Sequence, residues 1–569
     1  DRLAYLAGDQ SKELANGGSF RNRKTLMGDI VNSNPDYVGN SEDFGFSSLN
    51  PEGSSYSSFL TSTKASRAPM LYVGANDGML HALNANTGAV VFAEVPRGVY
   101  SNLSQLPDPG YGHHYFVDGS PQSVDTYFNS GWHTLLAGST GAGGRDVFLL
   151  DVTSPTSFTA TNVLWDYDGV DGTTSGASLP DKDLGYTIGQ PTIARFHDGD
   201  WYMVFGNGYN STNGDAVLYL YNINTKTLRK FDTKVGTSGV SGTGTANGLS
   251  TPIPVDYNND RITDAIYAGD LQGNLWKLDV SSSNSANWGF ALKTGDSPSG
   301  NPVPLFQAHD DSGDLQPITE RPQVGLDNTG RVMVYFGTGT YYQVGDNTVP
   351  SNPAIQSFYG IVDTQSGKVA TNVVTRSTNP ATNQLLQQTI LSEQTVSGTP
   401  YRITSDNQIT SGQEGWYIDL YYKDASNNVT DPGERVVSEA VLSGGRIIFT
   451  TVIPEGDACQ YGGSSWLMEL DSSTGSRLTN ESPFDLDGNN KIDNSDLVTI
   501  TNPDGTTSVV AVSGKQSNVG IIQTPGIISA GEIQYKYYSG STGKIGETVE
   551  SASSSQGGRL SWQQLLPKQ

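Results

Sequence analysis

Oxygen-bearing side chains recur at alternate positions in residues 256–264, which read Asp-Tyr-Asn-Asn-Asp-Arg-Ile-Thr-Asp. A Ca²⁺ ion takes about six to eight oxygen ligands, and the loops that bind it supply them from alternate positions. Counted from Asp256, this stretch offers side-chain oxygens at positions 1, 3, 5 and 9 and a carbonyl at position 7. The sequence therefore predicts a Ca²⁺ site with the ligands Asp256, Asn258, Asp260, Ile262 (through its main-chain carbonyl) and Asp264.

This loop departs from the EF-hand pattern at two positions. Position 6 is Arg261 where EF-hands have Gly, and position 12 is Tyr267 where they have a bidentate Glu. We therefore expect a nine-residue loop between two strands, with water completing the ligand shell, and not a helix-loop-helix. The alternative is a solvated acidic turn, although three carboxylates this close repel one another without a cation.

A second acidic loop, residues 485–496, reads Asp-Leu-Asp-Gly-Asn-Asn-Lys-Ile-Asp-Asn-Ser-Asp. It is closer to the EF-hand pattern than the first, because it also has a carboxylate at position 12. It lies in a polar hairpin insertion, where acidic turns also occur without metal. The sequence leaves both interpretations open, and the ligands of this candidate second Ca²⁺ site are Asp485, Asp487, Asn489, Lys491 (carbonyl), Asp493 and Asp496.

Other residues that could support catalysis do not form a recognisable site. The acidic stretch 166–172 lacks an oxygen at position 5 and is predicted to be a loop, and His113 and His114 have no metal-ligand partners nearby in the sequence. The Gly-rich stretches 141–144 and 206–208 do not open a helix that could hold a phosphate. No Walker loop, nucleophile elbow or His-Glu-x-x-His pattern is found. The sequence therefore predicts binding without catalysis.

The composition of the chain argues against several classes of binding partner. The chain has 58 acidic and 33 basic residues, and its net charge of −25 opposes binding to nucleic acid and to anionic lipid. No apolar run approaches the ~18 residues of a membrane span, so we expect no direct membrane insertion. The single cysteine, Cys459, excludes an internal disulfide. The chain starts at Asp1, and we expect it to be a piece of a longer exported polypeptide.

The elements that must position these loops are β-strands. Short β-branched or aromatic runs, bounded by Gly, Asp, Asn or Pro, recur along the chain, whereas helical periodicity is rare and is expected mainly at the termini. The sequence therefore predicts an all-β fold. The expected strands are Met70–Val73, Val147–Leu150, Trp201–Phe205, Val217–Tyr221, Leu275–Leu278, Val332–Phe336, Tyr417–Tyr421, Arg446–Val452 and Trp466–Leu470.

Several of these strands belong to a degenerate repeat, in which a strand, a small loop and a second strand lead into an Asp or Asn turn. The copies are Gly74–Gly88, Gly269–Asp279 and, in part, Trp466–Gly475. Asp77-Gly78 suits a tight hairpin turn, and Leu80 and Ala82 place one face of the strand against a neighbouring sheet. The repeat resembles the blades of quinoprotein-type β-propellers; an all-β sandwich of unrelated hairpins is the alternative.

Irregular spacing of the repeat predicts blades of unequal size. We expect an N-terminal lead-in over residues 1–40 and a modified β-propeller over residues 41–569. Candidate insertions are residues 40–66, 375–413 and 480–515, the last of which is the acidic hairpin.

Six longer stretches resemble the C-terminal domain of the PilC/PilY family, the tip-associated adhesins and biogenesis factors of type IV pili. They span roughly residues 20–480 and are far more specific than any single glycine motif. The stretches are LMGDIVNSNP (26–35), VGANDGMLHA (73–82), YFVDGSP (115–121), DLGYTIGQP (183–191), FGNGYNS (205–211) and FGTGTYY (336–342).

The resemblance implies a modified propeller of about seven blades, located at the pilus tip or cell surface. It implies roles in pilus extension, twitching motility, virulence and attachment to host cells, with pilins, minor pilins and the host cell surface as partners. It also implies that the Asp256 loop is a regulatory Ca²⁺ site that sets pilus extension against retraction; the 485–496 insertion is not covered. Two other functions remain open, a quinoprotein-type dehydrogenase and a lectin-like or integrin-binding adhesive propeller.

Overall fold

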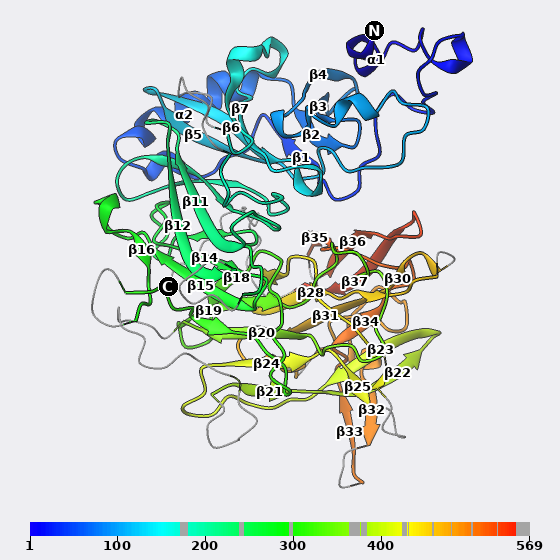
Figure 1. Ribbon diagram of the computed structural model, residues 1–569. Coiled ribbons are helices and arrows are strands. Elements are labelled where there is room, and N and C mark those ends of the chain that lie inside the picture. The colour runs from blue at the N-terminus through cyan, green and yellow to red at the C-terminus, as the bar shows by residue number, and fades with distance from the viewer. Residues whose placement is uncertain are drawn as a thin grey trace. The chain divides into compact units, whose positions relative to one another are not determined.

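Most of the regular secondary structure in the described residues is β-strand (Figure 1). We describe it from a computed structural model. The structure describes residues 1–552 except 171–179, 238–243, 295–299, 364–375, 377–383, 424–428, 431, 458–459, 480, 502–504 and 532. Cys459 therefore lies outside the described residues.

Three four-stranded antiparallel sheets follow one another in the first half of the chain. In each, strands adjacent in sequence are adjacent in the sheet, which is how a propeller blade is built. The first sheet is β1 (Asp36–Val38), β2 (Met70–Ala75), β3 (Met79–Asn84) and β4 (Val90–Glu94). The second is β5 (Gln122–Phe128), β6 (Gly131–Ser139), β7 (Val147–Asp151) and β8 (Val163–Tyr167), and the third β9 (Thr192–Arg195), β10 (Trp201–Gly206), β11 (Asp215–Asn222) and β12 (Thr227–Gly236).

Later sheets are larger and less regular. The fourth contains β13 (Ile253–Val255), β14 (Ala265–Gly269), β15 (Asn274–Asp279), β16 (Gly289–Phe290) and β17 (Phe306–Gln307). The fifth contains β18 (Gln323–Leu326), β19 (Val332–Gly337), β20 (Ser357–Val362), β24 (Gly415–Asp419) and β21 (Leu386–Gln388). The sixth has the order β22 (Ile390–Val396), β23 (Thr399–Thr404), β34 (Gly514–Gln516), β31 (Trp466–Asp471), β28 (Arg446–Thr450) and β27 (Val441–Ser443).

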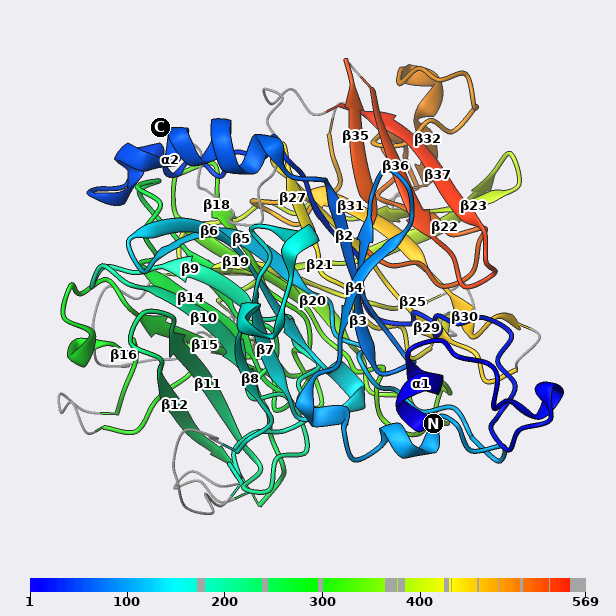
Figure 2. The same cartoon turned by 90° about the horizontal axis from the view of Figure 1, so that it is seen from above.

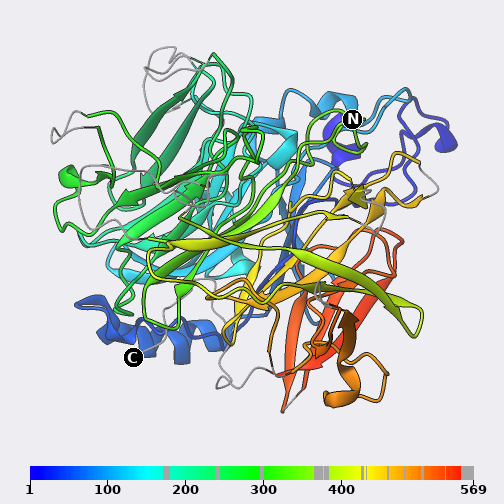
Figure 3. The same cartoon turned by 90° about the horizontal axis from the view of Figure 1, so that it is seen from below.

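Smaller sheets complete the described strands. A three-stranded antiparallel sheet near the C-terminus, β35 (Gly526–Ala530), β36 (Ile533–Ser539) and β37 (Ile545–Ser551), lies beside the acidic insertion, as Figure 3 shows in red and orange. The two-stranded sheets are β25 (Tyr422–Lys423) with β26 (Val429–Thr430), β29 (Ile453–Pro454) with β30 (Gly463–Ser464), and β32 (Val498–Thr501) with β33 (Thr507–Val510).

Helical segments are short. The α-helices are α1 (Arg2–Leu6) and α2 (Tyr56–Ser58), and the other helical turns are η1 (Leu14–Asn16), η2 (Phe46–Ser48), η3 (Glu52–Ser55), η4 (Phe59–Lys64), η5 (Arg97–Val99), η6 (Leu103–Gln105), η7 (Gly141–Gly143), η8 (Pro155–Ser157), η9 (Ala160–Asn162), η10 (Ser285–Asn287) and η12 (Asn494–Asp496). The run from η3 to η4 lies inside the predicted insertion 40–66, so the expectation of helix mainly at the termini was incomplete. No described helix is long and apolar enough to cross a membrane.

This helical run packs against β5 and β6 (Figure 2). Tyr56 contacts the Trp132 ring with centroids 4.5 Å apart, and both rings belong to one buried cluster. Lys64 is completely buried, and its Nζ lies 2.6 Å from the Asp125 carboxylate, which also accepts the Tyr56 hydroxyl. Because a buried ammonium is stable only when paired, this ion pair fixes where the segment docks.

The nine predicted strands are all present, with small changes at their ends. The strand expected at 417–421, for example, begins at Gly415 and ends at Asp419, two residues earlier at each end. Asp77 and Gly78 form the β2–β3 turn, with Gly78 at φ 93°, and Leu80 and Ala82 are buried as expected. In the third repeat copy, a Cβ on Gly475 (φ 70°) would lie 2.2 Å from the Trp416 ring, so this turn requires glycine.

By contact density the chain separates into two compact units. Of the described residues, one unit comprises Asp1–Ile266 and Leu278–Phe290, and the other comprises Tyr267–Lys277 and residues 291–552. The first unit includes β1, so the end of the predicted lead-in 1–40 contributes a strand to the first sheet. The second includes a core in which the Phe358 and Phe449 rings stack 4.0 Å apart. The predicted insertion 480–515 leaves the sixth sheet after β31 and returns at β34.

Candidate metal sites

The first acidic loop connects two neighbouring strands of the fourth sheet, β13 and β14, as predicted. The Asp264 amide donates to the Val255 carbonyl at 2.8 Å, which closes the base of the loop. The Ile262 side chain packs against the buried cluster of the first unit. Strand pairing and apolar packing therefore fix both ends of the loop.

Asp256 organises the loop backbone. Its Oδ1 accepts the amides of Asn258, Asn259 and Asp260 at 3.1, 2.7 and 3.3 Å, and its Oδ2 accepts the Arg261 amide at 2.7 Å. Burial raises the pKa of Asp256 and the nearby Asp260 carboxylate raises it further, while the Arg261 amide opposes both. A buried carboxylate beside another is the environment in which a divalent cation gives the most stabilisation.

Asp264, at position 9, has a partner that the sequence did not indicate. Its Oδ1 lies 2.8 Å from His197 Nε2, and its Oδ2 accepts the Tyr257 amide at 2.8 Å. His197 lies in the turn between β9 and β10, 67 residues earlier. Its ring orients one candidate ligand from outside the loop, as partners of metal-ligating carboxylates commonly do. No local sequence signal identifies a contact at this separation.

The second loop has the same backbone frame as the first. In each, the position 1 carboxylate accepts the position 6 amide at 2.7 Å, from Arg261 in one loop and Asn490 in the other. Position 3 accepts the position 5 amide at 2.9 and 3.0 Å, and position 5 accepts the position 7 amide at 2.9 and 2.7 Å. Two sequences with few residues in common therefore fold into one type of oxygen-rich loop.

Backbone conformation agrees with this correspondence. Positions 4 and 6 have positive φ in both loops, with Asn259 at 63° and Arg261 at 70° in the first, and Gly488 at 76° and Asn490 at 60° in the second. Arg261 thus adopts the left-handed conformation for which EF-hands use glycine. At position 6 the first loop therefore differs from an EF-hand in residue type but has the same backbone conformation.

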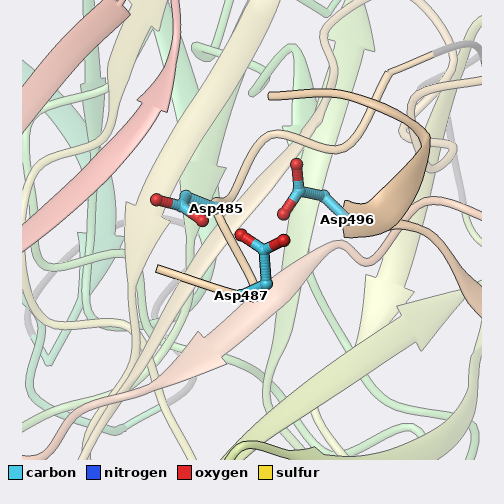
Figure 4. A group of neighbouring side chains, drawn as sticks. All are labelled: Asp485, Asp487 and Asp496. Carbon is cyan, nitrogen blue, oxygen red and sulfur yellow. The ribbon is translucent and has the colours of Figure 1, made fainter. Parts of the chain in front are cut away.

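Carboxylates of the second loop converge more closely than those of the first. Asp485, Asp487 and Asp496 each offer an oxygen within 4.8 Å of the others, and their carboxylates face one another in Figure 4. Among the described residues, this is the one acidic cluster that meets that distance, and the first loop does not. Asn489 borders the cluster, because its Nδ2 donates to Asp487 Oδ2 at 2.9 Å.

Asp496 closes this loop from a buried position. Its oxygens accept the Leu486 and Asp493 amides at 2.7 and 2.8 Å. Burial raises the pKa of Asp496, and the charges of Asp485 and Asp487 add to this shift. Asp493 instead accepts hydrogen bonds from Ser495, which lower its pKa, and it does not join the close cluster. All candidate ligand atoms in both loops are oxygens, the ligand type that Ca²⁺ and other hard cations prefer.

Comparison with known proteins agrees with the fold. Residues 27–399, more than half of the chain, match the family described as the PilY1 beta-propeller domain. The chain belongs to the PilY1 β-propeller family. It is 37% identical over 511 residues to the type IV pilus biogenesis factor PilY1 of Pseudomonas aeruginosa strain PAK, which covers 85% of this chain and 41% of that protein. A PilY1 homolog of Xylella fastidiosa is 37% identical over 492 residues, covering 83% of this chain and 31% of that protein.

A solved relative supports the same assignment. The crystal structure of the Pseudomonas aeruginosa PilY1 C-terminal domain matches 90% of this chain and 99% of that domain, with a TM-score of 0.70 and 30% identity. The all-β propeller fold is thereby confirmed, whereas the number of blades stays a prediction. The chain spans less than half the length of the curated PilY1 relatives it matches.

The third acidic stretch, 166–172, was predicted to be a loop but begins within a strand, since Asp166 belongs to β8, and its last two residues lie outside the described residues. The Asp166 carboxylate meets that of Asp146, which is completely buried. Asp146 Oδ2 accepts the Gly98 amide at 2.8 Å, whereas no hydrogen-bond donor reaches Oδ1. Burial raises the pKa of Asp146 well above its usual range, as does the adjacent Asp166, and we therefore expect Asp146 to keep a proton that it shares with Asp166. Burial and Asp166 also raise the pKa of Glu94 to about 7.

Asp146→Asn should therefore make the protein less sensitive to alkaline pH. The unfolded carboxyl ionises near 3.8 while the folded one keeps its proton, so wild-type stability falls as pH rises above about 4 until the folded pKa is passed. An amide donates to Asp166 without titrating. We expect equal stability near pH 4 and an advantage for the variant of about 1–3 kcal/mol at pH 8, measured by urea unfolding.

Asp108→Asn is the control for the Asp146 variant, because Asp108 is an exposed acid of the same unit and an asparagine still accepts the Gly110 amide there. It should not produce this pH dependence. A variant of Asp146 that is less stable than wild type by the same amount at every pH would contradict the shared proton.

Proposed function

We propose that this chain is a Ca²⁺-binding domain of a type IV pilus biogenesis factor, located at the pilus tip or cell surface, that acts by binding and not by catalysis. The backbone frame shared by the two acidic loops is the observation that carries the proposal. The similarity to PilY1 proteins, described as pilus biogenesis factors, supports the biological setting. The main site uses Asp256, Asn258, Asp260, the Ile262 carbonyl and Asp264.

The second site uses the loop 485–496. Asp485, Asp487 and Asp496 form its centre, Asn489 and the Lys491 carbonyl complete positions 5 and 7, and Asp493 acts through water. Ca²⁺ neutralises the three clustered carboxylates, whose mutual repulsion is unfavourable without it. This loop lies beside the C-terminal sheet, since the Asp485 amide donates to the Val549 carbonyl in β37.

In this proposal, bound Ca²⁺ affects pilus function by ordering the 256–264 loop. A bound ion couples β13 to β14 and fixes the surface that the 256–264 loop presents to pilins, minor pilins or the host cell. Extracellular Ca²⁺ modules commonly have affinities of about 10⁻⁴–10⁻³ M, so occupancy responds to calcium outside the cell. The occupied state favours one side of the balance between pilus extension and retraction, and twitching motility and host-cell attachment follow from that balance.

A cellular experiment tests this regulation. The full-length protein carrying Asp264→Ala or Asp264→Lys replaces the wild-type protein in its own bacterium, and surface pili and twitching zones are measured. The alanine variant keeps the site empty, whereas the lysine ammonium supplies a positive charge where the ion would lie. We expect the two variants to shift pilus number and twitching in opposite directions, and Asp9→Ala, an exposed acid in the same unit, to match wild type.

The outcomes separate binding from regulation. If Asp264→Ala loses calcium binding in calorimetry but twitches normally, the regulatory role is wrong although the site is real. If both variants bind calcium as wild type does, the ligand assignment itself is wrong. Dye reduction with alcohols or sugars after addition of a quinone cofactor would instead favour the dehydrogenase alternative.

A further inference from the structure

A cavity of about 550 Å³ opens in the first unit and includes no residue of either acidic loop. Its walls are residues 97–98, 100–102 and 143–145, together with Asp168 and Tyr186. The volume is within the range of small-molecule sites, about 300–1,000 Å³. The Gly-rich stretch 141–144, for which the sequence suggested no ligand, ends in this wall.

Two arginines in the walls have unused hydrogen-bond donors. Arg145 donates from one terminal nitrogen to the Asn210 carbonyl at 2.8 Å and lies 5.4 Å above the Tyr186 ring. The Arg97 guanidinium is 37% exposed and, among the described residues, approaches only Asp168, at 3.9 Å, which is too long for a hydrogen bond. Each guanidinium has five N–H donors, so most remain available to a ligand.

Two glycines in the walls allow the chain to pack closely against buried residues. A Cβ on Gly98 would lie 2.4 Å from that of Asp146, and one on Gly143 would lie 1.8 Å from the Phe116 carbonyl. Neither position accepts a side chain without movement of the backbone. The two arginines are thus carried by segments that are already fixed, which lowers the entropic cost of binding.

Aromatic and small polar groups form the rest of the site. Tyr100 and Tyr186 are 57% and 37% exposed although both are large apolar rings. Asn102 accepts a long 3.4 Å hydrogen bond from Gln105, and its amide donor is free in the described structure. Asp168, 3.9 Å from Arg97, adds hydrogen-bond acceptors to the walls. Ring faces beside planar hydrogen-bonding groups are suited to a ligand with an apolar face and several hydroxyls.

The charged side chains of the cavity walls favour a negatively charged ligand of this kind. The chain has a net charge of −25, yet the cavity walls contain two guanidiniums and one carboxylate. We propose that this cavity binds an acidic sugar residue, a hexuronate or a sialate. Its carboxylate pairs with Arg145 and Arg97, its hydroxyls bond to Asp168 and Asn102, and its ring packs on Tyr100. An acidic peptide would use the arginines but leave Asp168 and the tyrosines without a role.

Titration of the whole 569-residue chain tests the proposal. The probes are methyl glucuronide and N-acetylneuraminic acid, with methyl glucoside as the neutral match, followed by saturation-transfer NMR. We expect saturable binding of at least one acidic sugar, at least tenfold weaker binding of the neutral sugar, and no change when EDTA removes calcium. Arg145→Ala should weaken binding at least tenfold and Arg145→Lys less, because lysine cannot bind a carboxylate in the bidentate manner.

Controls keep the result interpretable. Arg331→Ala, a partly exposed arginine of the other unit paired with Asp327, should bind as wild type does. Arg97→Gln is a second variant in case Arg145→Ala disturbs folding, which circular dichroism monitors. Equal binding of acidic and neutral sugars, no saturable binding, or tighter binding of a blocked Asp-containing peptide would each overturn the proposal.

Discussion

Replacing Lys536 with methionine is expected to lower the free energy of unfolding by about 3–5 kcal/mol, because it removes one member of a buried ionic cluster. Lys536, on β36, is 0% exposed, and its Nζ contacts Glu469 at 2.5 Å and also Glu550. Arg446 contacts Glu469 at 2.7 Å from the other side. These side chains join the C-terminal sheet to the sixth sheet, and without Lys536 the Glu469 carboxylate keeps Arg446 as its cationic partner while Glu550 loses its contact with Lys536.

Replacing Glu469 and replacing Glu550 should lower the free energy of unfolding by different amounts. Burial opposes ionisation of Glu469, but Lys536 and Arg446 lower its pKa to about 2, so it carries the negative charge. Burial and the neighbouring Glu469 raise the pKa of Glu550 well above its usual range. Glu550→Gln, which replaces an already neutral acid, should cost less than about 1 kcal/mol, whereas Glu469→Gln should cost several.

Urea unfolding followed by tryptophan fluorescence measures these differences, and hydrogen exchange of β36 and β37 localises them. Lys544→Met is the matched control, since Lys544 is exposed in the turn between those strands. If Lys536→Met and Lys544→Met unfold at the same urea concentration, the cluster contributes no net stability. Equal costs for the two glutamine variants would contradict the unequal charge distribution.

Local features of this fold could be predicted from the sequence. The β2–β3 hairpin follows from alternation of apolar residues on either side of Asp77-Gly78, whose backbone preference is local. The two acidic loops were also predicted from residue spacing alone, since each is built from the backbone amides that its own carboxylates accept. Such features depend on residues fewer than about a dozen positions apart.

Contacts between distant residues could not be predicted in this way. Lysines are rarely buried, so Lys64 and Lys536 are expected on the surface until their carboxylate partners are known. The pair of His197 with Asp264 joins the β9–β10 turn to the β13–β14 loop, which belong to different sheets. The sixth sheet places β34 beside β31 only after the whole acidic insertion has left and returned. In each case, the three-dimensional course of the backbone decides which residues meet.

Asp256→Ala and Asp260→Ala are expected to abolish calcium binding at the first loop with different costs in stability. Asp256 accepts four backbone amides and is itself largely buried, so its loss removes four partly buried hydrogen bonds and should cost about 2–3 kcal/mol even without calcium. Asp260 accepts one amide, from Ile262, in an exposed part of the loop. Its replacement should cost less than about 1 kcal/mol.

Isothermal calorimetry distinguishes the two loops by stoichiometry. The wild-type chain should bind two Ca²⁺ ions, either Asp256→Ala or Asp260→Ala should bind one, and Asp260→Ala combined with Asp487→Ala should bind none. Asp487 is exposed, so its replacement should not disturb the fold. A wild-type stoichiometry of one, unchanged in Asp487→Ala, would mean that the convergent carboxylates of the second loop hold no ion.

The calcium dependence of the free energy of unfolding then distinguishes residues that hold the backbone of the first loop from residues that bind its ion. For a site with a dissociation constant of about 10⁻⁴ M, 1 mM Ca²⁺ adds about 1.4 kcal/mol to the free energy of unfolding. Asp260→Ala should therefore match the calcium-free wild type closely but fail to gain the first-loop increment on adding calcium. Asp256→Ala should already be less stable without calcium. A variant of Asp260 that keeps the full calcium increment would show that the loop has the backbone of a calcium site without its coordination.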